Sequence, residues 1–230
     1  MAATPDFAGF TPAALRLLRS LERHNDRVWF APRKERFTRE LLEPMQALVV
    51  TATQALRAAK LPLVGDPRRS VFRLYRDVRF SPDKRPYRTH LAAYLSLDGG
   101  RATPGGVYVH VAPPGSFLAV AFYQLERPML ARWRTDMASR PRAFAGVVRA
   151  LARRTLTIEL PDESDDALAR MPRGFAAYEG SELAPYFRLR SFVVRRQLQA
   201  RDISSAVLVE RIVELARESK PLLDFGWRLI

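Results

Sequence analysis

Charged side chains are densest between Arg73 and His90, an 18-residue stretch that holds six arginine or lysine residues and two aspartates. A guanidinium group binds a phosphate or carboxylate through two parallel hydrogen bonds, so arginines repeated at short intervals are typical of sites for anions. Nearby carboxylates can hold such cations in place or, with a phosphate substrate, bind Mg²⁺. The stretch therefore predicts a site for a small anionic or phosphate-containing ligand and leaves open whether a reaction follows. The candidate ligand-binding residues, seven from this stretch and one histidine further along the chain, are Arg73, Arg76, Asp77, Arg79, Asp83, Lys84, Tyr87 and His110.

Alternation of apolar and polar residues over 71–80 predicts a strand with one polar face. On such a strand Arg73, Asp77 and Arg79 lie on the same face, so we expect these three side chains to act together. Arg76 lies on the opposite face, where it needs a buried carboxylate or carbonyl partner. The strand would thus present arginines to a ligand, with an aspartate between them to hold them in position.

The residues that follow are expected to complete the site. A turn at 81–83, with the sequence Ser-Pro-Asp, can bring Lys84 back towards the strand. Tyr87 is expected to supply a hydroxyl group at the rim. His110 is the best candidate for a general base, provided that its sheet face also bears the strand at 71–80.

Two other interpretations of these residues stay open. Arginines and aspartates on a solvated surface pair with one another without any ligand, in which case the stretch is structural and the protein is an interaction domain. The whole chain has 38 Lys and Arg against 24 Asp and Glu, a formal net charge of +14, which also fits weak, non-specific binding to nucleic acid. Only four of the 38 are lysine and the excess is spread along the chain, so no basic tail marks such a partner.

Hydrophobic periodicity predicts the elements that must position these residues. Apolar side chains recur at helical spacing over 11–60 and again after Pro128, after Pro141 and near the C-terminal end. Between these regions the period changes to two, which indicates strands joined by short turns. We therefore predict one α+β domain over residues 1–230, with an antiparallel meander flanked by N- and C-terminal helices. The expected strands are 71–80, 91–97, 107–112 and 117–123, with shorter ones at 155–160 and 188–194.

The sequence also excludes several classes of chemistry. The chain has no cysteine, so disulfides, thiolate zinc sites, iron–sulfur clusters and a cysteine nucleophile are ruled out. Its three histidines are not spaced as metal ligands, and glycine-rich phosphate loops and nucleophile motifs are absent, so we expect neither a metal nor a cofactor. Residues 1–9 lack the basic and apolar regions of a signal peptide, and prolines and glycines interrupt the longest uncharged run, 102–125. We expect a cytoplasmic protein with no membrane partner.

Three blocks of the sequence resemble a known family. The string FRLYRDVRFSPDKRPYR at 72–88 resembles the signature of the bacterial and fungal "domain of unknown function 2461" family. An upstream block, HNDRVWF at 24–30, and a downstream block, RMPRGF at 170–175, are similar to further elements of its pattern. The resemblance implies a single domain over nearly the whole chain and carries no reaction type. Within the 72–88 string it directs attention to Arg76, Asp77, Asp83, Lys84 and Tyr87.

Overall fold

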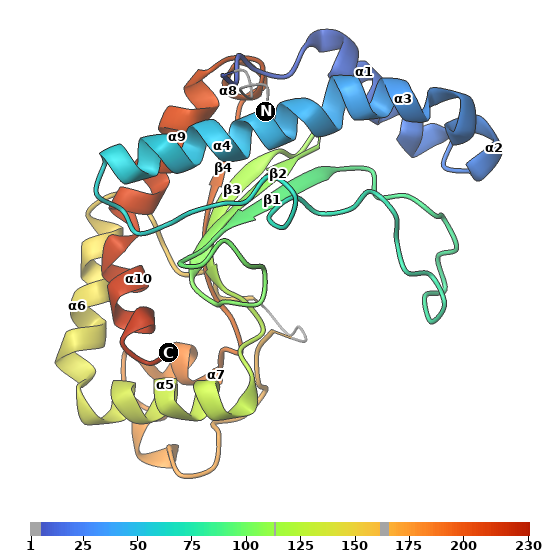
Figure 1. Ribbon diagram of the computed structural model, residues 1–230. Coiled ribbons are helices and arrows are strands. Elements are labelled where there is room, and N and C mark those ends of the chain that lie inside the picture. Colours follow the sequence, from blue (N-terminus) through green and yellow to red (C-terminus); the bar gives the residue numbers. More distant parts are fainter. Residues whose placement is uncertain (1–5, 113, 162–165) are drawn as a thin grey trace. The chain divides into compact units, whose positions relative to one another are not determined.

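The structure is a computed structural model that describes residues 6–112, 114–161 and 166–230 (Figure 1). Residues 1–5, part of the segment used above to predict the location of the protein, lie outside the described residues. The chain groups into two compact units, each assembled from three separate segments. The first unit comprises Met1–Thr103, Val107–Leu118 and Gln197–Glu214, and the second comprises Pro104–Gly106, Ala119–Arg196 and Leu215–Ile230. The prediction of a single domain stays a prediction.

Helices dominate the first part of the chain, as the periodicity over 11–60 predicted. Thr11 begins α1 by accepting a hydrogen bond from the backbone N–H of Ala14, and Asp26 begins α2 by accepting one from the backbone N–H of Trp29. The helical elements here are α1 (Pro12–Arg23), α2 (Arg27–Phe30), the 3-10 turn η1 (Ala31–Arg33), α3 (Lys34–Phe37), the π-helical turn η2 (Thr38–Leu42) and α4 (Glu43–Ala58). Helix α4 packs against strand β1 (Leu91–Leu95) and buries Met45, Leu48 and Leu56.

The sheet has four strands in the order β1-β2-β3-β4, which confirms the predicted α+β class with a sequential antiparallel sheet. The other strands are β2 (Gly106–Val111), β3 (Phe117–Phe122) and β4 (Phe192–Gln197). In the antiparallel pair of β1 and β2, Leu91 lies opposite Val111 and Leu95 opposite Val107. The predicted strands 91–97, 107–112 and 117–123 therefore end within two residues of the observed bounds, and the strand predicted at 188–194 begins later, at Phe192.

The predicted strand at 71–80 is wrong. Only two isolated bridges occur there, between Val71 and Ala93 and between Tyr75 and Tyr87. Beyond the first bridge the chain turns back on itself, because residues 74–88 form an irregular hairpin whose arms exchange hydrogen bonds from Arg76 N–H to the Pro86 carbonyl and from Arg88 N–H to the Leu74 carbonyl. Prolines in this hairpin have no N–H to donate to a strand ladder. The strand predicted at 155–160 is likewise reduced to one bridge, between Ile158 and Val194.

The second unit has an aromatic core. Trp133 stacks on Phe192 with ring centroids 4.2 Å apart, and Phe144 meets Phe225 edge to face at 5.0 Å. The helices predicted after Pro128 and Pro141 are present and carry Trp133 and Phe144. Helical elements from here to the end of the chain are α5 (Arg127–Ser139), α6 (Pro141–Ala152), η3 (Ala176–Tyr178), α7 (Ala184–Arg188), α8 (Ala200–Ile203), α9 (Val207–Glu218) and α10 (Lys220–Trp227).

Candidate functional site

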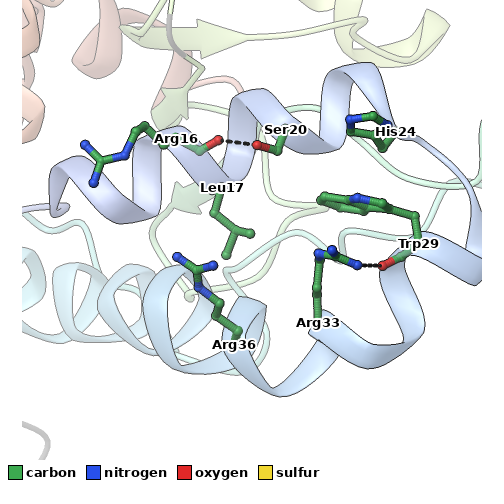
Figure 2. A pocket seen from close by; sticks show the side chains of 7 residues that line it. All are labelled: Arg16, Leu17, Ser20, His24, Trp29, Arg33 and Arg36. Carbon is green, nitrogen blue, oxygen red and sulfur yellow. Dashed lines mark hydrogen bonds between the residues drawn. The ribbon is translucent and has the colours of Figure 1, made fainter.

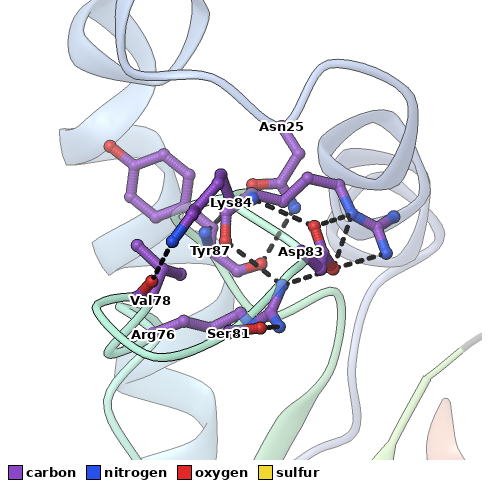
Figure 3. A network of polar contacts seen from close by, with 8 residues as sticks. Asn25, Arg76, Val78, Ser81, Asp83, Lys84 and Tyr87 are labelled. Carbon is purple, nitrogen blue, oxygen red and sulfur yellow. Dashed lines mark hydrogen bonds and ion pairs between the residues drawn. The ribbon is translucent and has the colours of Figure 1, made fainter.

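Asp83 is the centre of the polar contacts in the 74–88 hairpin (Figure 3). Its carboxylate accepts a hydrogen bond from Arg76 Nη1 at 2.7 Å and from Arg85 Nη2 at 2.9 Å. Arg76 also donates to the Arg85 carbonyl at 3.2 Å, so it has a carboxylate and a carbonyl partner. The expected burial of this contact is wrong, because the side chains of Arg76 and Asp83 are 27% and 35% exposed. The hydrogen bonds from Arg85, then those from Arg76, hold the pKa of Asp83 well below its usual range. This carboxylate is therefore ionised and shared between two guanidinium groups.

Lys84, Asp77 and Arg79 also have partners within the hairpin. Lys84 Nζ donates to the carbonyls of Val78 and Arg79, at 3.1 and 3.4 Å. Asp77 and Arg79 form an ion pair of 2.7 Å whose side chains are 61% and 77% exposed, and the hydrogen bonds from Arg79 lower the pKa of Asp77. The structure thus joins Arg76 and Arg85 through Asp83, and it binds Lys84 to the hairpin backbone. Asp77 and Arg79 pair with each other in solvent.

Tyr87 is buried, with 3% of its surface exposed, so the expectation of a rim position is wrong. Its ring stacks on Phe30 at 4.1 Å and contacts Tyr75 at 5.1 Å. Burial, and then the neighbouring Tyr75, raise the pKa of the Tyr87 hydroxyl. The backbone of Tyr87 is held by Asn25, whose Oδ1 accepts from the Tyr87 N–H at 3.0 Å and whose Nδ2 donates to the Tyr87 carbonyl at 2.9 Å. Two of the blocks that carry the family resemblance are therefore in direct contact.

His110 lies on β2 in an aromatic cluster. Its ring is 4.3 Å from that of His90 and stacks on Phe117 at 4.6 Å, and Nδ1 is 3.4 Å from the Tyr108 hydroxyl. Burial, and then the charge of Arg88, lower the pKa of His90. The strand at 71–80, on which the general-base assignment depended, does not form, so a catalytic role for His110 stays a prediction.

Arg73 is separated from the hairpin network. It lines a cavity of about 410 Å³, together with Lys34 and Arg68, which belong to other parts of the chain. The set of residues predicted to form one site therefore divides into the hairpin network, an exposed ion pair, a buried tyrosine, a histidine on the sheet and an arginine at a separate cavity.

A basic pocket that the sequence did not predict lies between α1 and the α2–α3 region (Figure 2). We call it the arginine pocket; it has a volume of about 400 Å³. Among the described residues that line it there are three arginines, a histidine and a tryptophan, but no carboxylate. The lining residues are Arg16, Leu17, Ser20, His24, Trp29, Arg33 and Arg36.

Trp29 organises one side of the arginine pocket. The Arg33 guanidinium lies 4.4 Å from the indole centroid and donates to the Trp29 carbonyl at 2.8 Å, while the His24 ring stacks on the indole at 5.4 Å. Arg36 pairs with Glu40, one turn further on, at 2.8 Å. Trp29, Arg33 and Arg36 are spaced i, i+4 and i+7, so a helical reading of this segment places them on one face. That spacing is the signal that could have revealed the pocket.

Helix α1 supplies the other side of the arginine pocket. Leu18 and Leu21 are fully buried, and their position fixes the rotation of the helix. Leu17 points towards the α2–α3 region, and Arg16 and Ser20 also line the pocket (Figure 2). No hydrogen bond or ion pair joins the Arg16 guanidinium to any described residue; its backbone carbonyl accepts from the Ser20 hydroxyl at 3.0 Å. Among the described residues, the Arg16 guanidinium of this pocket thus has no partner for its donors.

Other classes of site find no support in the described parts of the chain. No three histidine, aspartate or glutamate side chains come together there as metal ligands. In the same residues, none of the helices has the length and apolar character needed to cross a lipid bilayer.

Comparison with protein-family models matches residues 13–225 to a family described as "Conserved hypothetical protein (DUF2461)". Comparisons with curated proteins and with solved structures gave no match. The family match spans the arginine pocket, the 74–88 hairpin and nearly all of the sheet and helices. The resemblance inferred from the three sequence blocks is thereby confirmed, and the chain belongs to the DUF2461 family of conserved hypothetical proteins.

Proposed function

We propose that this protein binds a small anionic, phosphate-containing ligand, and that the ligand occupies the arginine pocket. The observation that supports the proposal is the excess of cations there: Arg16, Arg33 and Arg36 line the pocket, and Glu40, outside the lining, is the only carboxylate paired with any of them in the described chain. Guanidinium groups stay protonated at every physiological pH and match the geometry of phosphate oxygens. A volume of about 400 Å³ lies within the range of small-molecule sites.

The proposed class of ligand is the one expected from the sequence, but its proposed binding site is the arginine pocket and not the stretch from Arg73 to His90. In the 74–88 hairpin, Arg76 and Arg85 already share Asp83, and Lys84 is bound to two carbonyls. A ligand there would have to replace bonds that the protein makes with itself, which reduces the net gain in free energy. These contacts fit the structural interpretation of the hairpin, and ligand binding by it stays a prediction that the same experiment tests.

Isothermal titration calorimetry with inorganic phosphate, pyrophosphate and a phosphomonoester tests the proposal. We expect Arg16→Ala to weaken binding by about tenfold, because a charge-assisted hydrogen bond contributes about 1.5 kcal/mol. Arg19→Ala is the matched control, since Arg19 is another exposed arginine of α1 that lies outside the pocket lining. Arg33→Lys keeps the charge but removes the planar fork, so it should also weaken binding.

Three outcomes would contradict the proposal. The first is that none of these anions binds the native protein, and the second is that Arg19→Ala weakens binding as much as Arg16→Ala. The third is that Lys84→Ala abolishes binding while Arg16→Ala leaves it unchanged, which would return the ligand to the hairpin.

A further inference from the structure

The helical segment from α2 to η2 has a second face, and a groove runs along it. Phe30, Lys34 and Phe37 follow Trp29, Arg33 and Arg36 by one position each, so they lie on a neighbouring face of the segment and line a different cavity. Across the groove lie Val71, which precedes the 74–88 hairpin, and Leu74, the first residue of the hairpin. The cavity measures about 410 Å³, and all of it lies within the first unit.

The floor of the groove is apolar and its rim is basic. Phe30, Phe37 and Leu41 at the floor are each less than 5% exposed. Lys34, Arg68 and Arg73 are exposed and line the same cavity, and no acidic residue does so among the described ones. The groove therefore offers buried hydrocarbon contact below and positive charge above.

The basic residues of this rim are available to a ligand. Within the described chain, neither the Lys34 ammonium nor the Arg73 guanidinium has a hydrogen bond or ion pair, whereas the neighbouring cations Arg76 and Arg79 are both paired. Arg73 is one of the seven candidates that the sequence indicated between Arg73 and His90. It lines this groove, and the other six candidates do not.

Local backbone geometry distinguishes the same place. Thr38, Leu41 and Leu42 line the groove and belong to η2, the π-helical turn. Such turns are rare, are wider than an α-helical turn, and occur frequently at functional sites. On the other side of the groove, isolated bridges and not a continuous strand ladder hold the segment at 71–75. Its successive side chains therefore need not point to alternate sides, as they do in a strand.

From this combination we propose that the groove binds an amphipathic anion, namely an acyl chain that carries a carboxylate, free in solution. The chain would lie on Phe30, Phe37 and Leu41, where removal of apolar surface from water favours binding. The carboxylate would lie at the rim, within reach of Arg73 and Lys34, where charge-assisted hydrogen bonds form. This site is separate from the arginine pocket and does not depend on the proposed function.

Calorimetric titration with decanoate tests this inference. We expect saturable binding of one decanoate per chain, at least about tenfold tighter than binding of butyrate, because the shorter chain buries less apolar surface. Decyltrimethylammonium, with the same chain and the opposite charge, should bind at least about tenfold more weakly than decanoate. Equal binding of the two decyl compounds would overturn the proposal.

Substitutions at the rim locate the site. Arg73→Ala should weaken decanoate binding by about tenfold, and Arg73→Lys should restore part of it. Arg57→Ala, which removes an exposed arginine of α4 outside the groove, is the matched control and should leave binding unchanged. All three variants alter exposed side chains, so their melting temperatures without ligand should equal that of the native protein.

Two further measurements separate this groove from the other surfaces. Arg16→Ala should keep its affinity for decanoate, whatever its effect on phosphate. Leu42→Asp introduces a negative charge at a half-buried position of the groove and should abolish decanoate binding, with an unchanged circular dichroism spectrum as the check of folding. The proposal is overturned if decanoate does not bind, if Arg73→Ala and Arg57→Ala behave alike, or if protein sediments with neutral phosphatidylcholine vesicles but fails to bind free decanoate.

Discussion

At the scale of single residues, Asn25 makes the pair of backbone hydrogen bonds that a neighbouring strand usually makes. Its amide accepts from and donates to the backbone of Tyr87, 62 positions away in the sequence. An amide is the smallest side-chain group that offers both a donor and an acceptor in one plane, so aspartate or leucine, though similar in size, can supply only part of this contact or none of it. Asn25 thus fixes the backbone of the 74–88 hairpin at Tyr87, beside the stacking of the Tyr87 ring on Phe30.

We expect Asn25→Ala to lower the free energy of unfolding by about 1–3 kcal/mol, because the half-buried N–H and carbonyl of Tyr87 lose their partners together. Gln54→Ala removes an exposed amide from α4 and should change the stability by less than about 0.5 kcal/mol. Urea denaturation followed by tryptophan fluorescence measures both. Equal stabilities of the two variants would show that the Asn25 bonds contribute nothing.

Asp83 gives the hairpin a defined dependence on pH. Its pKa is depressed in the folded protein, so its ion pairs stabilise the fold above the unfolded pKa of about 3.9, and this contribution is lost as the pH falls through the lower folded-state pKa. Urea midpoints of the native protein and Asp83→Asn should therefore differ most near neutral pH, and the difference should begin to shrink below about pH 4. A difference that grows on acidification would contradict the assignment.

At the scale of elements, helices were predictable and the 71–80 strand was not. Helix α1 follows from local features: a threonine cap, a proline in the first turn and leucines at helical spacing that are all buried. A strand depends on a distant partner, and the alternation over 71–80 contained no information about whether β1 would continue to pair with it. Phe80 illustrates the failure, because the pattern predicted it on an apolar face and its side chain is 93% exposed.

The arginine pocket was missed for a related reason. The spacing of Trp29, Arg33 and Arg36 can be read from the sequence, but the helix that faces them cannot, since it depends on the packing of leucines in α1 against the rest of the first unit. In contrast, the type of partner expected for Arg76, a carboxylate or carbonyl, is found, because it follows from the chemistry of one side chain, whereas the expected burial is not. Which carboxylate would meet it, Asp83 and not Asp77, required the fold.

Phe80 and Phe37 form a contrasting pair that tests this account of the hairpin. Phe80→Ser should change the free energy of unfolding by less than about 0.5 kcal/mol, since the ring is in solvent. Phe37→Ala should cost about 3–5 kcal/mol, because that ring is 4% exposed and its loss leaves a cavity. Chemical denaturation of both proteins decides the matter: a large cost for Phe80→Ser would mean that residues 71–80 pack as the predicted strand.

At the scale of the whole molecule, the two compact units are interleaved along the chain. Each takes segments from three places, so the backbone passes repeatedly from one to the other. Such a division differs from two domains joined by a linker, and it is consistent with the proposal of a single domain over residues 1–230. The net charge of +14 also belongs to this scale, and weak binding to nucleic acid stays a prediction that rests on charge alone.

The single-domain proposal predicts one cooperative unfolding transition. Fluorescence of Trp29 reports on the first unit and that of Trp133 on the second, so single-tryptophan variants can follow each unit separately. Replacement of the other tryptophans by phenylalanine leaves each reporter alone, and we expect the two urea curves to coincide within error. Two transitions with separate midpoints would establish two independently stable domains.

The interleaving also constrains how the protein can be made. The first unit contains the N-terminal residues but also needs Gln197–Glu214, and the second is completed only by Leu215–Ile230. Ribosomes add about 5–20 residues per second, so a nascent chain spends roughly ten seconds or more with its early helices exposed and without the segment that completes their unit. The first unit therefore cannot mature early in synthesis, as the first domain of a tandem protein does. Each unit can therefore fold completely only after its last segment has been synthesised, Gln197–Glu214 for the first unit and Leu215–Ile230 for the second.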